Sequence, residues 1–364
     1  GSAVVHDAKS GTTECLNFLG VAPMAAREDM WADAIEGETA DAFGFMLRGR
    51  INALGHQAVM VPGNLKGYQA LLESYGTLSW LDVCRSAIAL ADGGWMVRPH
   101  VYAYASQDEE AQGRVHNADI LGFTAEGRTL YLGSDGQIKK PGNLLRNPQL
   151  GNMLKTVAEE GVDAFYKGDI GVRIADDMKA KGGLITRDDL AAYEVVRATP
   201  VSGSYRGLKV TTNAPGGSGV QVVETLNILE HFDLRAMGHN TPEYIRTLAE
   251  AIAHAFNDKR SKVGDPAFVD VPVGELTDKA YAKALASQID AGEKAVLQRM
   301  DAAESADTSH VSTLDEHGNA VTMTHTLGAP SGVITPGTGF ILNGCMSIFD
   351  PRPGKAMSIA PGKP

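Results

Sequence analysis

The sequence is short of the features that mark membrane, nucleic-acid-binding and disulfide-stabilised proteins. Among its 364 residues no apolar run approaches the roughly 18 residues that a membrane-spanning helix needs. Lys and Arg number 33 against 44 Asp and Glu, which gives a net charge of −11, and no basic run is present. An acidic chain of this kind argues against nucleic acid or an anionic membrane as a partner. With 43% hydrophobic residues it can still fill a large core in one or two lobes.

Patterns of metal ligands and cysteines are equally sparse. The 3 cysteines, Cys15, Cys84 and Cys345, are an odd number without the spacing of a zinc site, so each is expected to be a small buried residue. Glu250 and His254 share a helix face at i,i+4, but the sequence offers no third ligand beside them. We therefore expect neither a metal nor a cofactor.

The glycine-rich loop 213–219 follows a predicted strand and precedes a predicted helix. It lacks the lysine and hydroxyl residue that close a P-loop, so a tight strand-to-helix turn is the preferred interpretation.

Hydrophobic periodicity and capping residues predict a mixture of helices and antiparallel strands. The segment 103–150, with scattered glycines, is expected to hold strands and loops. A helix capped by Thr241 is expected to bury Ile245, Leu248, Ile252 and Phe256, which recur at spacings of three and four residues. Other helices are predicted over 65–75, 80–92, 149–160, 168–181 and 220–231, and strands over 3–6, 12–18 and 208–212.

The stretch 307–327, DTSHVSTLDEHGNAVTMTHTL, predicts a β-hairpin. Residues 315–319 supply the turn between two arms of similar length. Thr326, at the end of the second arm, should therefore return beside Thr308 at the head of the first. Two hydroxyls at the open end of a hairpin suit a nucleophile and its positioning partner better than a core. Apolar and β-branched residues alternate with polar neighbours along the arms: Val311, Thr313, Val321 and Met323.

Cleavage of the peptide bond between Asp307 and Thr308 would give Thr308 a base within its own residue. A terminal α-amine has an ordinary pKa of about 7.7–8.0, so roughly a tenth of it is neutral at pH 7. This amine can take the proton from the Thr308 hydroxyl, and the β-branched side chain restricts where that oxygen lies. On the residues alone, an ordinary strand threonine remains the commoner alternative.

A series of short motifs keeps its order and spacing along nearly the whole chain. Downstream of the cleavage point these are 308–312, 318–321 and 336–343; upstream they are 61–63, 75–78, 161–168, 182–186, 205–207 and 264–266. Together they resemble the γ-glutamyltranspeptidases, N-terminal-nucleophile hydrolases that cleave themselves to expose a threonine. The resemblance implies that Thr308 is the nucleophile, that Thr326 hydrogen-bonds its amine, and that His310 supports the strand end.

The same resemblance implies an α+β fold, a four-layer αββα N-terminal-nucleophile hydrolase sandwich that is incomplete at both ends. The hairpin should lie centrally in one sheet, with the arm 12–18 close by. Residues 1–307 would be the large-subunit part and 308–364 the start of the small subunit. Both parts would come from one precursor and form one αββα unit, with a dimer of such pairs left open.

Against the family pattern, both ends of the sequence are expected to be unfinished. A leading segment that would carry an export signal is absent, so a periplasmic or secreted location and a cytoplasmic one both stay open. The glycine pair of the oxyanion hole would lie beyond residue 364.

The family's glutamyl-recognition residues are missing from the aligned positions. The arginine that holds the α-carboxylate aligns with Leu19, its acidic neighbour with Gly20, and the ammonium-binding aspartate with Ile348. Arg27 is near in sequence but stands in the wrong register. An unpaired charge in a dry pocket costs several kcal/mol, so a less charged acyl group is predicted. The candidate substrate-binding residues are Leu19, Gly328 (aligned with a family asparagine), Asn343, Cys345 and Ile348.

These observations leave three functions. The first is a threonine amidohydrolase or acylase that cleaves a small-molecule amide through an acyl-enzyme, with an acyl group other than a standard γ-glutamyl. The second is a genuine γ-glutamyltransferase or glutathione hydrolase. The third is an unprocessed, non-catalytic homologue.

Overall fold

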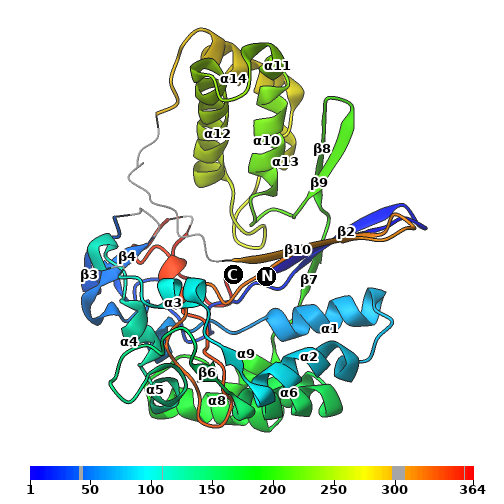
Figure 1. Cartoon of the computed structure of the whole chain (residues 1–364). Coiled ribbons are helices and arrows are strands. Elements are labelled where there is room, and N and C mark those ends of the chain that lie inside the picture. The colour runs from blue at the N-terminus through cyan, green and yellow to red at the C-terminus, as the bar shows by residue number, and fades with distance from the viewer. Residues whose placement is uncertain (41–43, 109, 297–307, 356) are drawn as a thin grey trace.

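The structure is a computed structural model that describes residues 1–364 except 41–43, 109, 297–307 and 356. The chain is α+β, as predicted. A five-stranded sheet crosses the middle of the molecule, with the helices α1–α9 on one side and the helices α10–α14 on the other (Figure 1). No helix in the described part of the chain is both long and apolar enough to cross a membrane.

The central sheet is antiparallel and joins the two ends of the sequence. Its strand order is β10-β11-β1-β2-β7. Alternation buries Ala3, Val5 and Leu16 on one face, while Val4 and Cys15 are buried on the other. The strands are β1 (Ser2–Asp7), β2 (Thr12–Asn17), β7 (Val196–Ala198), β10 (Ser309–Leu314) and β11 (Ala320–His325).

The predicted hairpin and the strand pair at the start of the chain are both confirmed, but the hairpin is not central. Among the described strands β10 is an edge strand, because only β11 pairs with it. The arm 12–18 is close by, separated from β11 by β1 alone.

The helices below the sheet enclose the largest core. Val157, Ile174, Met178 and Leu190 are fully buried there. Helix α1 approaches the sheet closely, since a Cβ on Gly67 would lie 2.2 Å from the ring of Phe18. The helices are α1 (Asn64–Tyr75), α2 (Trp80–Gly93), α6 (Pro148–Glu160), α7 (Asp163–Tyr166), α8 (Asp169–Ala180) and α9 (Arg187–Ala191), and they confirm the helices predicted in this half.

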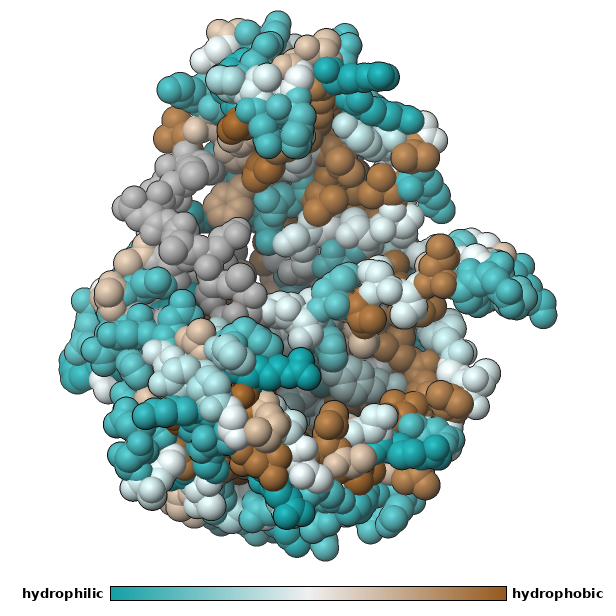
Figure 2. Space-filling view, in the orientation of Figure 1, coloured by the Kyte–Doolittle hydropathy of each residue, from teal (hydrophilic) through white to brown (hydrophobic). Residues whose placement is uncertain are grey.

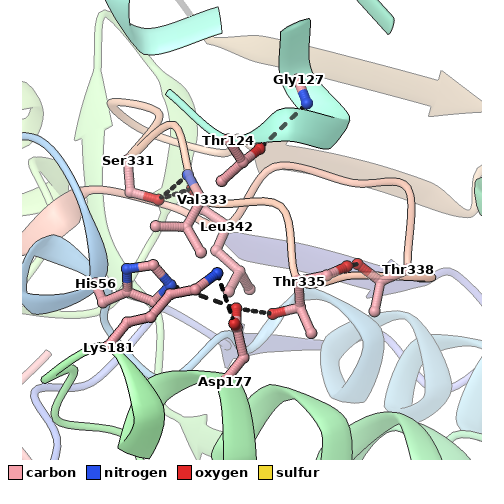
Figure 3. Close-up of polar contacts among 10 residues, drawn as sticks. All are labelled: His56, Thr124, Gly127, Asp177, Lys181, Ser331, Val333, Thr335, Thr338 and Leu342. Carbon is pink, nitrogen blue, oxygen red and sulfur yellow. Dashed lines mark hydrogen bonds and ion pairs between the residues drawn. The ribbon is translucent and has the colours of Figure 1, made fainter. Parts of the chain in front are cut away.

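The segment predicted to hold strands and loops contains loops, but several short helices stand where strands were expected, so that part of the prediction was wrong. Two of these helices have a local cap. The His116 ring accepts a hydrogen bond from the Ala118 amide at 3.0 Å, and Thr124 accepts one from Gly127 at 3.1 Å (Figure 3). Helices of five to seven residues are too short to show a clear period. The elements are β5 (Trp95–Met96), α3 (Pro99–Ala105), α4 (Asn117–Leu121), α5 (Ala125–Tyr131) and β6 (Leu144–Leu145).

The lobe above the sheet is a helix bundle with a small hairpin. Thr241 caps α12 as predicted, and Leu248 packs against the core of the lobe, but the predicted apolar stripe was wrong at Ile245 and Ile252, which are 53% and 43% exposed. The face that packs inward carries Thr247, Ala251 and Ala255, whose small side chains allow close packing. The elements are β8 (Val201–Tyr205), β9 (Leu208–Thr212), α10 (Gly219–Leu229), α11 (Leu234–Met237), α12 (Pro242–Lys262), α13 (Val273–Leu276) and α14 (Lys279–Asp290).

Apolar side chains reach the surface where this lobe meets the rest of the molecule (Figure 2). Val222 of α10 and Val311 of β10 are 43% and 41% exposed. The remaining elements are β3 (Ile35–Glu38), β4 (Phe45–Leu47) and the 3-10 turns η1 (Ala32–Ala34), η2 (Arg48–Arg50), η3 (His56–Ala58), η4 (Glu110–Gln112) and η5 (Cys345–Ile348).

Candidate active site

The β10–β11 hairpin is paired up to the positions next to Thr308 and Thr326. Ser309 pairs with His325, so the next position outward on each arm is a threonine. Thr308 is exposed, and Asp307 lies outside the described residues.

The turn fixes this register. The Asp315 carboxylate accepts hydrogen bonds from the amides of His317 at 2.9 Å and Asn319 at 2.8 Å. These bonds and one from the Asn319 side chain hold the pKa of Asp315 below its usual range. The observed pairing ends at Ser309 and His325, so the meeting of Thr308 with Thr326 stays a prediction.

Helix α1 holds the end of β11 at two points. Asn64 Nδ2 donates to the Thr326 carbonyl at 3.2 Å, and the Tyr68 hydroxyl lies 2.5 Å from His325 Nδ1. Burial raises the pKa of Tyr68, so its hydroxyl remains a neutral donor. Thr326 Oγ1 accepts from the Gly328 amide at 2.9 Å. Sequence reasoning missed Asn64 and Tyr68; their i,i+4 spacing is visible, but nothing local names a partner far along the chain.

A row of hydroxyls braces His310, two residues from Thr308. His310 Nδ1 lies 2.8 Å from Thr324 Oγ1, and Nε2 lies 2.9 Å from Thr322 Oγ1 and 3.1 Å from Ser312 Oγ. Both ring nitrogens are engaged with strand hydroxyls. This geometry fits support of the strand end better than proton transfer at Thr308.

Asn343 joins the segment after β11 to the chain at Met60. Its Oδ1 accepts from the Met60 amide at 3.0 Å and the Cys345 amide at 3.2 Å, and its Nδ2 donates to the Met60 carbonyl at 2.8 Å. The side chain is buried, with 9% exposure. The Asn343 amide is therefore engaged by backbone groups, and a role in the site would be indirect.

Gly328 and Cys345 lie against each other. Gly328 has φ of +70°, and a Cβ there would lie 2.2 Å from Cys345 Sγ, so no side chain fits without displacing the thiol. Cys345 is only partly buried, unlike Cys15 and Cys84, which are buried as predicted. Burial nevertheless raises the pKa of the Cys345 thiol, which stays protonated at neutral pH.

Leu19 and Gly20 lie on the other side of the Met60 segment. The Leu19 carbonyl accepts from the Tyr193 hydroxyl at 2.7 Å, and a Cβ on Gly20 would meet the Val61 carbonyl at 3.1 Å. The side chain of Leu19 is 36% exposed. Asn343 and Gly20, the neighbour of Leu19, thus both contact Met60, while Gly328 contacts Cys345.

Ile348 ends the turn η5 that begins at Cys345, and its side chain is 42% exposed. Arg27 does not supply the missing cation here, because it pairs with Asp29 at 3.5 Å and its side chain is 71% exposed. The predicted substrate-binding positions Leu19 and Ile348 accordingly present apolar surface.

A buried charged cluster anchors the segment that follows Gly328. Asp177 of α8 lies 3.3 Å from His56 Nε2 and 2.8 Å from Lys181 Nζ, and accepts from Thr335 Oγ1 at 3.1 Å (Figure 3). Burial lowers the pKa of His56, against the opposing effect of Asp177. Ser331 adds a bond to the Leu342 carbonyl at 2.7 Å. No local pattern in the sequence pointed to this cluster, which joins three distant segments.

Metal ligands do not converge in the described ranges, where no group of three or more His, Cys, Asp or Glu could hold an ion. Glu250, half of the i,i+4 pair, accepts a hydrogen bond from the Ala295 amide at 2.8 Å.

Two known proenzymes are similar to this chain over most of its length. The acylase ACY 1 proenzyme of Pseudomonas sp. (strain V22) is 39% identical over 357 residues, 96% of this chain and 61% of the acylase. The glutathione hydrolase proenzyme of Escherichia coli (strain K12) is 34% identical over 362 residues, 97% of this chain and 59% of the hydrolase. The chain therefore spans about three fifths of the length of these relatives.

Solved structures agree with this grouping. A cephalosporin acylase from Bacillus halodurans matches with a TM-score of 0.79 and 25% identity, over 100% of this chain and 63% of the other. The Helicobacter pylori gamma-glutamyltranspeptidase matches with a TM-score of 0.69 and 31% identity, over 79% and 78% of the two chains. The sequence profile of the gamma-glutamyltranspeptidase family matches residues 1–364. The chain belongs to the gamma-glutamyltranspeptidase family.

Proposed function

We propose that this chain is part of a self-processed threonine amidohydrolase, an acylase whose acyl group is not a standard γ-glutamyl. The observation that supports the proposal is the hairpin register, in which Ser309 and His325, the neighbours of Thr308 and Thr326, are paired while α1 holds the end of β11. Two relatives are named as proenzymes, which supports the proposal that this chain is also made as a precursor and then cleaved. The proposed cleavage site is the peptide bond between Asp307 and Thr308.

Processing leaves Thr308 as the first residue of the second chain. Its neutral α-amine takes the hydroxyl proton as Oγ1 attacks the amide carbonyl of the substrate. The tetrahedral intermediate collapses to an ester on Thr308, and the protonated amine gives its proton to the leaving amine. Water, deprotonated by the same amine, attacks the ester and releases the acid, which regenerates Thr308.

The neighbourhood favours an acyl group without the paired charges of glutamate. A γ-glutamyl donor brings a carboxylate and an ammonium, and each unpaired charge in a dry pocket costs several kcal/mol. Leu19 and Ile348 offer no counter-charge, and Gly328 has no room for a side chain. Relatives named as acylases support this reading. The relative named as a glutathione hydrolase keeps γ-glutamyl transfer as the second candidate.

The proposal includes the subunit plan and the layers. Residues 1–307 form the large-subunit part and 308–364 the start of the small subunit, within one four-layer αββα unit. In this plan, further strands of the four-layer unit would pair with β10, the edge strand of the five-stranded sheet. Pairs of subunits associate as a dimer in this plan.

A panel of amides tests the proposed chemistry. Purified, processed enzyme is expected to hydrolyse apolar acyl anilides at least about tenfold faster than γ-glutamyl anilide, a difference of about 1.4 kcal/mol in barrier. Thr308→Ala should abolish both activities. Release of p-nitroaniline from γ-glutamyl anilide as the preferred reaction, accelerated by glycylglycine, would support the second candidate instead.

A further inference from the structure

An apolar cavity of about 190 Å³ lies among α3, α4, α5 and the strands β5 and β6, in the part of the chain where helices replaced the predicted strands. Val101 and Ala105, one turn apart on α3, line one wall, and Ile120 and Leu121 of α4 line another. Trp95 of β5, which is 40% exposed, also borders it. No step of the proposed reaction uses this cavity.

The amide and the ammonium group in the lining are bonded to backbone carbonyls. Asn117 Nδ2 donates to the Tyr104 carbonyl at 3.1 Å. Lys139 Nζ donates to the carbonyls of Thr129 at 3.1 Å and Leu130 at 2.7 Å, so its charge is already solvated by the protein. Burial raises the pKa of Tyr131, which keeps that phenol neutral. The cavity therefore offers apolar contacts and no free counter-charge to an occupant.

The volume sets the size of what can bind. An apolar cavity of about 150 Å³ lined by aliphatic and aromatic side chains stays dry and accepts benzene. A cavity of 190 Å³ has room for one aromatic ring with one or two further heavy atoms. Transfer of that ring from water into the cavity is favourable, because each Å² of buried apolar surface contributes about 25 cal/mol of binding free energy.

The cavity shares one wall with the candidate active site. Pro330 lines it, stands two residues after Gly328 and forms a bridge with Asn343. We propose that this cavity is a binding site for a neutral, single-ring aromatic molecule, separate from the Thr308 centre but in contact with the segment that bears Gly328. The proposal does not depend on turnover at Thr308.

Calorimetric titration with two molecules of nearly equal size tests this proposal. Benzyl alcohol is neutral and should bind with a Kd of about 1 mM or lower. Benzoate carries a charge that the cavity does not compensate, so its affinity should be at least about tenfold weaker.

Ala105→Leu, which fills the cavity from α3, should weaken benzyl alcohol binding at least about tenfold. Ala103→Leu is the matched control, because Ala103 is exposed on the same helix and does not line the cavity. Val101→Phe is the second filling variant, used if circular dichroism shows that Ala105→Leu is not folded. Absence of benzyl alcohol binding, equal binding of benzoate, or wild-type affinity in a folded filling variant would each overturn the proposal.

Discussion

The contact between Tyr68 and His325 predicts that Tyr68→Phe slows catalysis without weakening substrate binding. The substitution removes one hydroxyl, which lies 2.5 Å from His325 Nδ1, and leaves the ring in place. A hydrogen bond of this kind contributes about 1 kcal/mol net, and an unsatisfied, partly buried partner adds a similar amount. We therefore expect the free energy of unfolding to fall by about 1–2 kcal/mol. If the same 1–2 kcal/mol is lost from the positioning of Thr326 at the end of β11, the activation barrier rises by about that amount. In that case kcat should fall by about 5- to 30-fold with KM little changed.

Tyr75→Phe on the same helix is the matched control. The Tyr75 hydroxyl also donates to a side chain, Glu14, at 2.6 Å, but Tyr75 is 41% exposed and far along α1 from Thr326. Its substitution should change stability by less than about 0.5 kcal/mol and leave kcat unaltered. The assays are chemical denaturation and initial rates on the best substrate of the amide panel. Equal kcat values for the two variants would refute the idea that α1 positions the nucleophile's partner.

Three further predictions concern the threonine pair, the acyl pocket and the upper lobe. Thr326→Val should abolish or strongly slow both processing and turnover, while Thr326→Ser retains a measurable fraction of each; intact mass and initial rates check this, and an active Val variant would contradict it. Leu19→Arg and Ile348→Asp should each fail to raise the rate of p-nitroaniline release from γ-glutamyl anilide. The rate of the double variant should exceed the product of the two single effects by about fivefold, a coupling of about 1 kcal/mol. Additive effects on the barrier would contradict a shared pocket. Burial and the neighbouring Asp258 carboxylate raise the pKa of Glu224 to about 9. Because the folded form then holds a proton that the unfolded form loses near its ordinary pKa of about 4.3, stability should fall as pH rises from there towards 9. Glu224→Gln should remove that slope and be more stable than wild type at pH 8 in denaturation curves; a less stable variant there would oppose a neutral Glu224.

Much of the fold could be predicted from the sequence where the signal is local. The turn residues 315–319 and the alternation along the arms predicted the hairpin, because strand register depends on turn geometry. Thr241 predicted the start of α12 through its capping side chain. These signals need only neighbours in the chain.

Other parts depend on contacts between distant segments and could not be predicted in this way. The apolar residues of α12 suggested one inner face, but the bundle packs the face with Thr247, Ala251 and Ala255, where small side chains allow close approach. The contact of Tyr68 on α1 with His325 on β11 and the contact of His56 with Asp177 each join segments more than a hundred residues apart. Residues of such contacts carry no pattern of their own.

For the site residues, too, the family pattern gave the positions in the sequence but not the hydrogen-bond partners. The positions Gly328 and Cys345 were found through the family pattern, and the structure places them in contact with each other. Asn343 was predicted as a substrate contact, whereas its amide is engaged by the Met60 and Cys345 backbone. Hydrogen-bond partners of this kind become visible only in three dimensions.

The most direct test of the central claim is the mass and first residue of each chain in the purified protein. The account predicts two chains, the second beginning at Thr308 with a free α-amine, and a single uncut chain for Thr308→Ala. A wild-type protein that stays whole through long incubation yet hydrolyses amides, or a cut at any other bond, would contradict it.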